Sequence, residues 1–456
     1  MVKGLLNFRD KKCFFSLENF DLILEEIDDR DKRTSVDFHE LMSFRDMEFP
    51  EYLVGKDFDD QEILFKVIHG YKKSIKTYYV RVQSYIIFKG NECSFDAVQF
   101  ISEELNWFYD IRHAIDFDTK PSTGEIKLRT HKFSDLEKQF SFKLNEDLIR
   151  GKFNISRSFN QNVTNPLSLY TELSLYCDKS LSYIQLHELT YGFINVMSFL
   201  SYRKNISMNK AHLKKLDQDS GEYKKVGTLY VSRLSDGVEE DEKIVKERII
   251  DISLIEKSLG RLFEEILNKQ IYLRHIPESS RHQRITTPSR FIMATAGFEW
   301  QYDLYEDKEI DEDHQYKEQK EEILKFLNQK IDSNTGKEKR YFKRIRGLVN
   351  RNNITLSDEF EISLNRYYDI LSVFIKRLYS IKNETEIDLN EIAYRIATYR
   401  NEIAHGELQG RENDYLISDL KVVECLCYSM VLDEIGVSAE NIKRALNKLF
   451  RFNFAL

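Results

Sequence analysis

Up to about residue 160, the apolar positions occur in short runs of β-branched and aromatic residues separated by turn residues. Runs of this kind are typical of β-strands, and we predict strands at 77–82 and 84–88. The segment 121–124 (PSTG) predicts a hairpin turn between two further strands. Residues 167–177 predict another pair of strands.

The pattern changes to helical spacing between residues 181 and 200. Apolar side chains recur there at helical spacing, at Ile184, Leu186, Leu189, Phe193, Val196, Met197 and Leu200. Residues 209–225 are polar and predict a loop, after which 228–231 return to the sheet. We therefore expect residues 1–240 to form one β-rich domain with a packed helix.

Beyond Lys243 the spacing is helical almost throughout. An apolar stripe runs from Ile252 to Ile266, and Pro288 stands where a helix begins, a position that suits proline. Further helices are predicted at 291–300, 324–349, 358–379, 388–405 and 414–432. Their short connections favour an antiparallel bundle. The charge-rich segment 303–322 predicts a solvated helix face or loop. The expected fold class is thus α+β, with a β-rich domain at 1–240 followed by an all-α domain at 241–456.

Composition narrows the classes of function. The 456 residues are 41% hydrophobic and 32% charged, and the net charge of −8 gives no general attraction to nucleic acid. An RNA contact therefore requires a local basic patch. The five cysteines are widely scattered, which indicates reduced thiols in an intracellular protein. The N-terminus carries charge where a signal peptide is apolar, and the most apolar window, 191–202, is too short to span a bilayer. We expect a cytoplasmic protein without membrane contact.

The segment 399–406 (YRNEIAHG) combines an arginine, an asparagine and a histidine within one short helical stretch. Asp388 is suited to begin this helix, and Gly406 is suited to end it. Apolar residues from Ile392 to Ile403 form a stripe that anchors the helix in the bundle. Arg400 and Asn401 lie off that stripe.

Arg400, Asn401 and His405 are the candidate catalytic residues, and their chemistry is that of RNA cleavage without a metal. His405 would take a proton from a ribose 2′-hydroxyl or supply one to the leaving 5′-oxygen. Arg400 would stabilise the charge of the phosphorane-like transition state, and Asn401 would orient a phosphate oxygen or the imidazole. The expected products are a 2′,3′-cyclic phosphate and a 5′-hydroxyl.

Helix geometry points to a dimer. Five residues of helix advance about 140° beyond one full turn, so Arg400 and His405 do not stack. Two copies related by a two-fold axis would place two Arg and two His around one cleft. Small Ala404 would allow the helices a close approach.

The segment 400–405 (RNEIAH) resembles the R-x4–6-H signature of HEPN domains. The layout of a β-rich domain followed by a helical bundle is similar to that of ApeA-like anti-phage proteins. This resemblance implies a homodimeric, metal-independent endoribonuclease of abortive infection, acting on RNA, with tRNA among the candidate substrates. It also implies that the β-rich domain is a sensor for a phage-derived trigger. A catalytically inactive HEPN bundle used for binding or assembly is the alternative.

Two other segments suggest contact with RNA or a metal. Residues 336–351 are strongly basic, and Lys343, Arg344 and Arg346 are the candidate RNA-binding residues. Asp116 or Asp118, with Glu125 and Lys127, matches the loose D…ExK pattern of Mg²⁺-dependent nucleases, but a solvated hairpin is the preferred interpretation. The sequence has no Gly-rich phosphate loop and no dinucleotide fingerprint, so we predict no cofactor and no metal.

Overall fold

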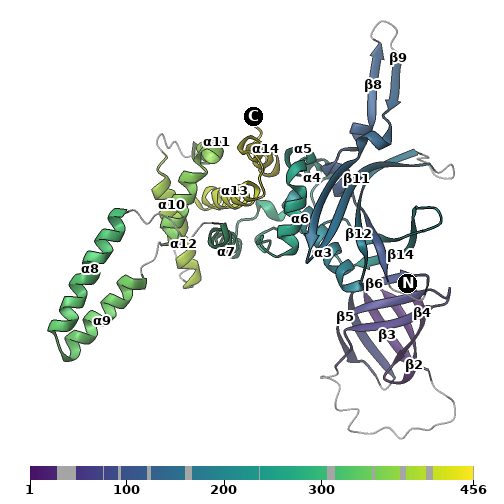
Figure 1. Cartoon of the computed structure of the whole chain (residues 1–456), viewed down its shortest axis with the longest axis horizontal. Coiled ribbons are helices and arrows are strands. Elements are labelled where there is room, and N and C mark those ends of the chain that lie inside the picture. Colours follow the sequence, from purple (N-terminus) through teal and green to yellow (C-terminus); the bar gives the residue numbers. More distant parts are fainter. Residues whose placement is uncertain are drawn as a thin grey trace. The chain divides into compact units, whose positions relative to one another are not determined.

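The computed structural model describes residues 1–27, 48–74, 76–90, 94–120, 125–159, 167–235, 237–305, 314–351, 355–380, 387–406 and 414–454. For 117–120, 125–128, 314–317, 348, 350 and 351 it describes only the backbone. The chain forms two compact units (Figure 1). One consists of Met1–Asn268 with Pro277–His282, and the other of Lys269–Ile276 with Gln283–Leu456. A β-rich, barrel-like region is followed by a helical region, so the fold class is α+β.

The N-terminal unit contains the strands and the first helices. The strands of the barrel are β1 (Val2–Phe8), β2 (Lys11–Glu18), β3 (Asp21–Glu26), β4 (Tyr52–Asp57), β5 (Glu62–Lys72) and β6 (Thr77–Phe88). Those that follow are β7 (Phe95–Ile101), β8 (Ile115–Lys120), β9 (Glu125–Thr130), β10 (Lys138–Leu144), β11 (Asp147–Phe159), β12 (Leu167–Leu181), β13 (Lys210–Leu216) and β14 (Tyr223–Val231). The helices are α2 (Glu103–Phe108), η1 (Ile111–Ala114), η2 (Phe133–Leu136), α3 (Tyr183–Ser201), α4 (Glu242–Lys246), α5 (Ile252–Ile255), η3 (Glu256–Ser258), α6 (Leu259–Leu267) and, within Pro277–His282, the first residue of η4 (His282–Arg284).

Strand β6 belongs to both parts of a single large sheet. Its residues 77–81 pair with β3 and its residues 84–88 pair with β14, while its other edge pairs with β5. The pairing of β5 with β6 closes β1 through β6 into a barrel filled by side chains such as Phe15, Phe65 and Val80. Strands β8 and β9 form a separate two-stranded sheet, and the other strands continue outward as an open sheet in the order β6-β14-β13-β7-β12-β11-β10. The two strands predicted at 77–82 and 84–88 are therefore one.

Helices α3 and α6 cover one face of the open sheet. Phe193 of α3 stacks on Phe100 of β7 with ring centroids 4.4 Å apart. Gly260 of α6 lies so close to β10 that a Cβ atom there would be 2.1 Å from the carbonyl oxygen of Ser141. Only glycine allows this approach. The other face of the open sheet carries the polar side chains.

The predicted loop at 209–225 is wrong, because these residues form most of the hairpin β13–β14. Ala211 and Leu213 are buried on one side of β13, while the intervening positions are polar or basic. The strand was missed because only two apolar side chains define the alternation of buried and exposed residues, and they lie among several lysines. Residues 167–177, predicted as two strands, belong to the single strand β12. The predicted turn at 121–124 lies outside the described residues.

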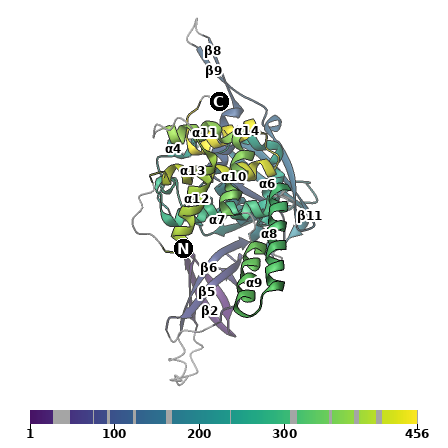
Figure 2. The same cartoon turned by 90° about the vertical axis from the view of Figure 1, so that its left-hand side faces the viewer.

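The C-terminal unit is helical. Its helices are α7 (Pro288–Tyr305), α8 (His314–Ser333), α9 (Gly336–Arg351), α10 (Leu356–Arg366), α11 (Tyr368–Ser380), α12 (Leu389–Ala404), α13 (Leu416–Glu434) and α14 (Ala439–Phe450). Helices α8 and α9 run side by side as a hairpin in both views (Figures 1 and 2). The helices predicted at 324–349 and 358–379 are each two helices, and α14 was not predicted. Within the described residues, no helix is long and apolar enough to cross a membrane.

The division between the units differs from the predicted boundary at 240/241. Residues 241–268 pack with the β-rich unit. The apolar stripe of α6 explains the difference. The centroid of the Phe263 ring lies 5.2 Å from the ring centroids of both Phe140 and Phe142 of β10. This stripe packs on the sheet.

Candidate active site

Helix α12 carries Arg400 and Asn401, His405 follows its last residue, and the helix begins and ends as predicted. The Asp388 side chain accepts hydrogen bonds from the backbone N–H groups of Asn390 and Glu391. At the other end the helix stops at Ala404, and Gly406 takes the left-handed conformation with φ of +77°. The position of His405 just beyond the last helical residue leaves its side chain exposed.

A buried carboxylate fixes α12 to its neighbours. Asp419 of α13 is fully buried and lies 3.0 Å from Nη2 of Arg395 on α12. The Tyr379 hydroxyl of α11 also donates to Asp419. The Arg395 guanidinium lies over the Tyr415 ring, 4.3 Å from its centroid. Three helices thus converge on one buried charge and set the direction of α12.

The Arg400 side chain is held by α7. Its Nη2 lies 2.9 Å from Oε1 and 3.0 Å from Oε2 of Glu299, and its Nη1 donates to Oδ1 of Asn401 over 3.2 Å. One residue earlier, the Tyr399 ring meets Phe291 of α7 edge-on at 4.9 Å. Arg400 is therefore only partly exposed, at 32% of its side chain. The guanidinium is oriented and paired before any phosphate arrives.

Asn401 and His405 lie on the outward side of α12. Both are exposed, and so is Tyr394, seven residues before Asn401 on the same helix face. Within the described part of the chain, no hydrogen bond or ion pair joins His405 to Arg400. A single chain therefore brings Arg400 together with Asn401 but not with His405.

Carboxylates surround the pairing partner of Arg400. Glu359 of α10 is partly buried near Asp303 and Glu299 of α7. Burial, followed by repulsion from Asp303, Glu299 and Asp358, raises the pKa of Glu359 from 4.5 to about 7. Near neutral pH this carboxyl group is thus partly protonated, and each additional negative charge here opposes the approach of a phosphate to Arg400.

We expect Glu359→Gln to stabilise the protein at pH 8 and to have little effect at pH 4. Glu359 favours the folded state below pH 4.5, and this contribution is lost as the pH rises through about 7. Because the side chain is partly exposed, the gain should be about 1 kcal/mol. Urea unfolding at both pH values measures it. The same change at exposed Glu338 of α9 should alter stability by less than about 0.5 kcal/mol at either pH.

The candidate RNA-binding residues lie on α9. Lys343, Arg344 and Arg346 are all exposed, and Nη1 of Arg346 donates to Oδ1 of Asn328 on α8 over 3.1 Å. In the described residues, no ion pair or hydrogen bond joins any of the three to α12. They form a separate basic patch on the α8–α9 hairpin.

The D…ExK residues lie on the hairpin β8–β9. In the backbone register of this hairpin, Asp118 is opposite Lys127 and Asp116 is opposite Arg129. The Asp116 carboxylate lies 3.0 Å from Nε2 of His131. The structure does not describe the side chains of Asp118, Glu125 and Lys127. Among the described residues, no group of three or more His, Cys, Asp or Glu side chains is placed to hold a metal.

Glu299 was missed by the sequence analysis, although the sequence holds a weak signal for it. It is the only acidic residue between Pro288 and Tyr302 in an otherwise largely apolar helix. A carboxylate on such a helix requires a partner, and here the partner is 101 positions away. Sequence alone does not identify that partner.

The fold and the site thus define a two-unit α+β protein with an Arg-Asn-His group at one helix end. Comparisons of the chain with models of protein families, with curated proteins and with solved structures found no match. Function is therefore inferred from the residues, their contacts and the resemblance described above.

Proposed function

We propose that the protein is a metal-independent endoribonuclease of the HEPN type that acts as a homodimer. The observation that carries the proposal is the end of α12, where Arg400 is held in place and His405 is exposed one residue beyond the helix. The proposed setting, by resemblance to ApeA-like proteins, is abortive infection against phage in the bacterial cytoplasm. The β-rich unit would then sense the trigger.

The proposed reaction uses each residue at a stated atom. An imidazole nitrogen of His405 accepts the proton of the ribose 2′-hydroxyl, whose oxygen attacks the adjacent phosphorus, and the P–O5′ bond breaks. The same imidazole then gives this proton to the leaving 5′-oxygen. The Arg400 guanidinium stabilises the added charge on the phosphate oxygens, and Asn401 donates from its amide to orient one of them.

A dimer would bring together Arg400 and His405, which a single chain keeps apart. Arg400 is directed to α7, whereas His405 lies on the outward side of α12. A two-fold axis near the end of α12 would bring the His405 of each copy toward the Arg400 of the other. Exposed Tyr394 and small Ala404 on the same helix are suited to such a contact.

One observation favours the competing function, a non-catalytic HEPN bundle for binding or assembly. Both oxygens of Glu299 already bind Nη2 of Arg400, so the guanidinium also serves to attach α12 to α7. In that case Arg400 would be a structural residue, and RNA would remain intact.

RNA incubated with the full chain in EDTA separates the two functions. The proposed enzyme should release fragments with 2′,3′-cyclic phosphate and 5′-hydroxyl ends, and it should leave a 2′-deoxy oligonucleotide of the same sequence uncut. Cleavage of both substrates, or cleavage abolished by EDTA, would contradict the mechanism. Intact RNA at high protein concentration would favour the assembly module.

A further inference from the structure

The face of the open sheet opposite α3 and α6 carries one row of side chains across several strands. Arg150 of β11 is opposite Tyr176 of β12, Tyr176 is opposite Ala97 of β7, and Ala97 is opposite Lys214 of β13. Lys214 is in turn opposite Lys225 of β14. Residues paired in this way lie on the same face of a sheet, and the row extends over four interstrand steps, or about 19 Å.

The β13–β14 end of this row is strongly positive. Two lysines directly opposite each other on neighbouring strands repel, which costs stability. His212 lies on the same face, and its pKa is lowered to about 4 by burial and then by Lys225, Lys210 and Lys214. Within the described residues, none of these three lysines forms an ion pair. The hairpin thus retains a repulsion that a bound anion would relieve.

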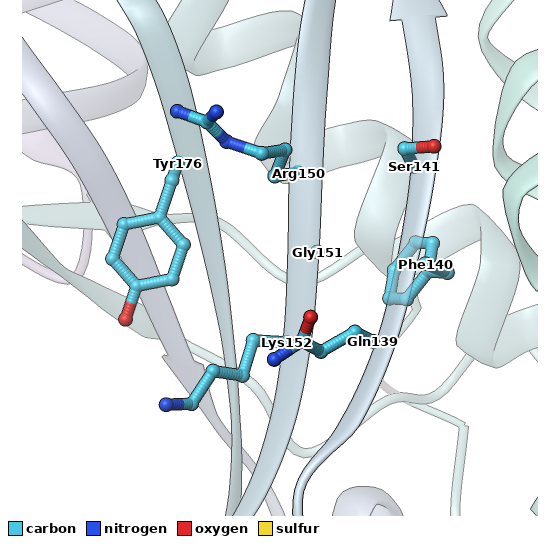
Figure 3. A pocket seen from close by; sticks show the side chains of 7 residues that line it. All are labelled: Gln139, Phe140, Ser141, Arg150, Gly151, Lys152 and Tyr176. Atoms are coloured by element: carbon cyan, nitrogen blue, oxygen red, sulfur yellow. The ribbon is translucent and has the colours of Figure 1, made fainter.

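The other end of the row is a pocket with aromatic and basic side chains. An open pocket of about 460 Å³ is lined by Gln139, Phe140, Ser141, Arg150, Gly151, Lys152 and Tyr176. In Figure 3 the side chains of Arg150 and Lys152 extend toward the strand that carries Tyr176. The Tyr223 ring of β14 meets Tyr176 at a centroid distance of 4.8 Å, so aromatic surface lies between the two groups of cations.

The carboxylates near this face leave its cations accessible. Arg150 pairs with Asp178, but both side chains are more than half exposed, at 58% and 55%. Lys152 pairs with Glu137 at 2.5 Å. The exposed Arg150–Asp178 pair contributes little, so a phosphate can replace Asp178, whereas the side chains of the Lys152–Glu137 pair are only 30% and 27% exposed. Near Lys214 the opposing charge is Glu172.

We propose that this face of the open sheet binds single-stranded nucleic acid, with phosphates on Arg150, Lys214 and Lys225 and a base against Tyr176. A groove that combines cations with aromatic rings suits unpaired bases, whose faces are free to stack. The bases of a duplex are already stacked, and an acidic peptide offers no planar base to the rings. The site shares no residue with the proposed nuclease centre and does not depend on it.

Fluorescence anisotropy of a labelled 12-nucleotide deoxythymidine strand with the full chain tests this site. The strand lacks 2′-hydroxyls, so the proposed nuclease reaction cannot consume it. The double substitution Lys214→Gln/Lys225→Gln should weaken binding at least about tenfold and reduce the salt dependence by about 1.4 in log–log slope. Tyr176→Leu should weaken binding about tenfold and leave that slope unchanged.

The chain offers a matched control on the same hairpin. Lys215 and Lys224 are the next opposed pair and are exposed on the other side of the hairpin. Lys215→Gln/Lys224→Gln should therefore change binding less than about twofold. Without ligand, Lys214→Gln/Lys225→Gln should raise the melting temperature by about 1–2 °C, because the repulsion is gone.

Three results would overturn the proposal. They are no binding by the wild-type chain, equal weakening by the two double variants, and competition by a 12-base-pair duplex or by polyglutamate as effective as that of the unlabelled single strand. This binding is measured on a strand that the proposed nuclease reaction cannot cleave. Failure at the sheet face therefore remains distinguishable from failure of the nuclease proposal.

Discussion

Arg400→Ala should reduce RNA cleavage in EDTA by at least about 100-fold, since one oriented donor to a developing oxyanion contributes a factor of about 10²–10³. His405→Ala should cause a loss of similar size, because it removes the group that transfers the proton. Single-turnover cleavage of an end-labelled RNA measures both. Cleavage that survives either substitution at the wild-type rate would exclude this site.

The controls separate the charge of Arg400 from its role in attaching α12. Arg400→Lys keeps the charge but loses the two-nitrogen geometry, so it should give an intermediate loss. Glu299→Gln removes a negative charge but keeps one acceptor for Nη2, so cleavage should rise about fivefold, or about 1 kcal/mol. Arg444→Ala, at an exposed arginine of α14, should have no effect. A loss of activity in Glu299→Gln would show that the ion pair supports the site instead of restraining it.

Mixing the two inactive variants tests whether two chains build the site. If Arg400 of one chain works with His405 of its partner, a mixed dimer of Arg400→Ala and His405→Ala chains retains one complete centre. Equal mixing should then restore about a quarter of wild-type activity. Recovery of no activity after subunit exchange would indicate that each chain works alone.

The second large effect is on stability. Asp419→Ala should destabilise the helical unit by about 3–5 kcal/mol, because it leaves Arg395 and the Tyr379 hydroxyl without their buried partner. The unfolding midpoint of that unit should fall by at least about 6 °C. Thermal unfolding followed by circular dichroism measures the change.

Glu391 provides the matched control, because it is also a partner of Arg395. Its side chain lies 3.4 Å from Nη1 of Arg395 but is 67% exposed. Glu391→Ala should therefore cost less than about 1 kcal/mol. Equal effects of Asp419→Ala and Glu391→Ala would contradict the assignment of Asp419 as the residue that fixes α12.

How far sequence predicts this fold depends on where the apolar residues lie. Helix α3 was predictable because its apolar spacing is long and regular, and the ends of α12 because Asp388 and Gly406 are strong local signals. The hairpin β13–β14 was not, because its sequence is dominated by lysines. The break between α8 and α9 was also missed, although Gly336 takes a positive φ of +64° there.

In the candidate site, too, the sequence predicted features of neighbouring residues but not contacts between residues that are distant in the chain. The sequence placed Arg400, Asn401 and His405 together near one helix end. It did not predict that Glu299 would hold Arg400, because that contact depends on how α7 and α12 pack. The cross-strand meeting of Lys214 and Lys225 likewise required knowledge of strand register.

The sharing of β6 between barrel and open sheet has a consequence for how the β-rich unit folds. Buried and partly exposed residues alternate along this strand without interruption, from Tyr78 in the barrel interior to Phe88 in the open sheet. A slip by one position would turn the apolar side chains of both parts toward water at once. Neither part can therefore adopt a shifted alignment while the other keeps its own, and the two should form and unravel together.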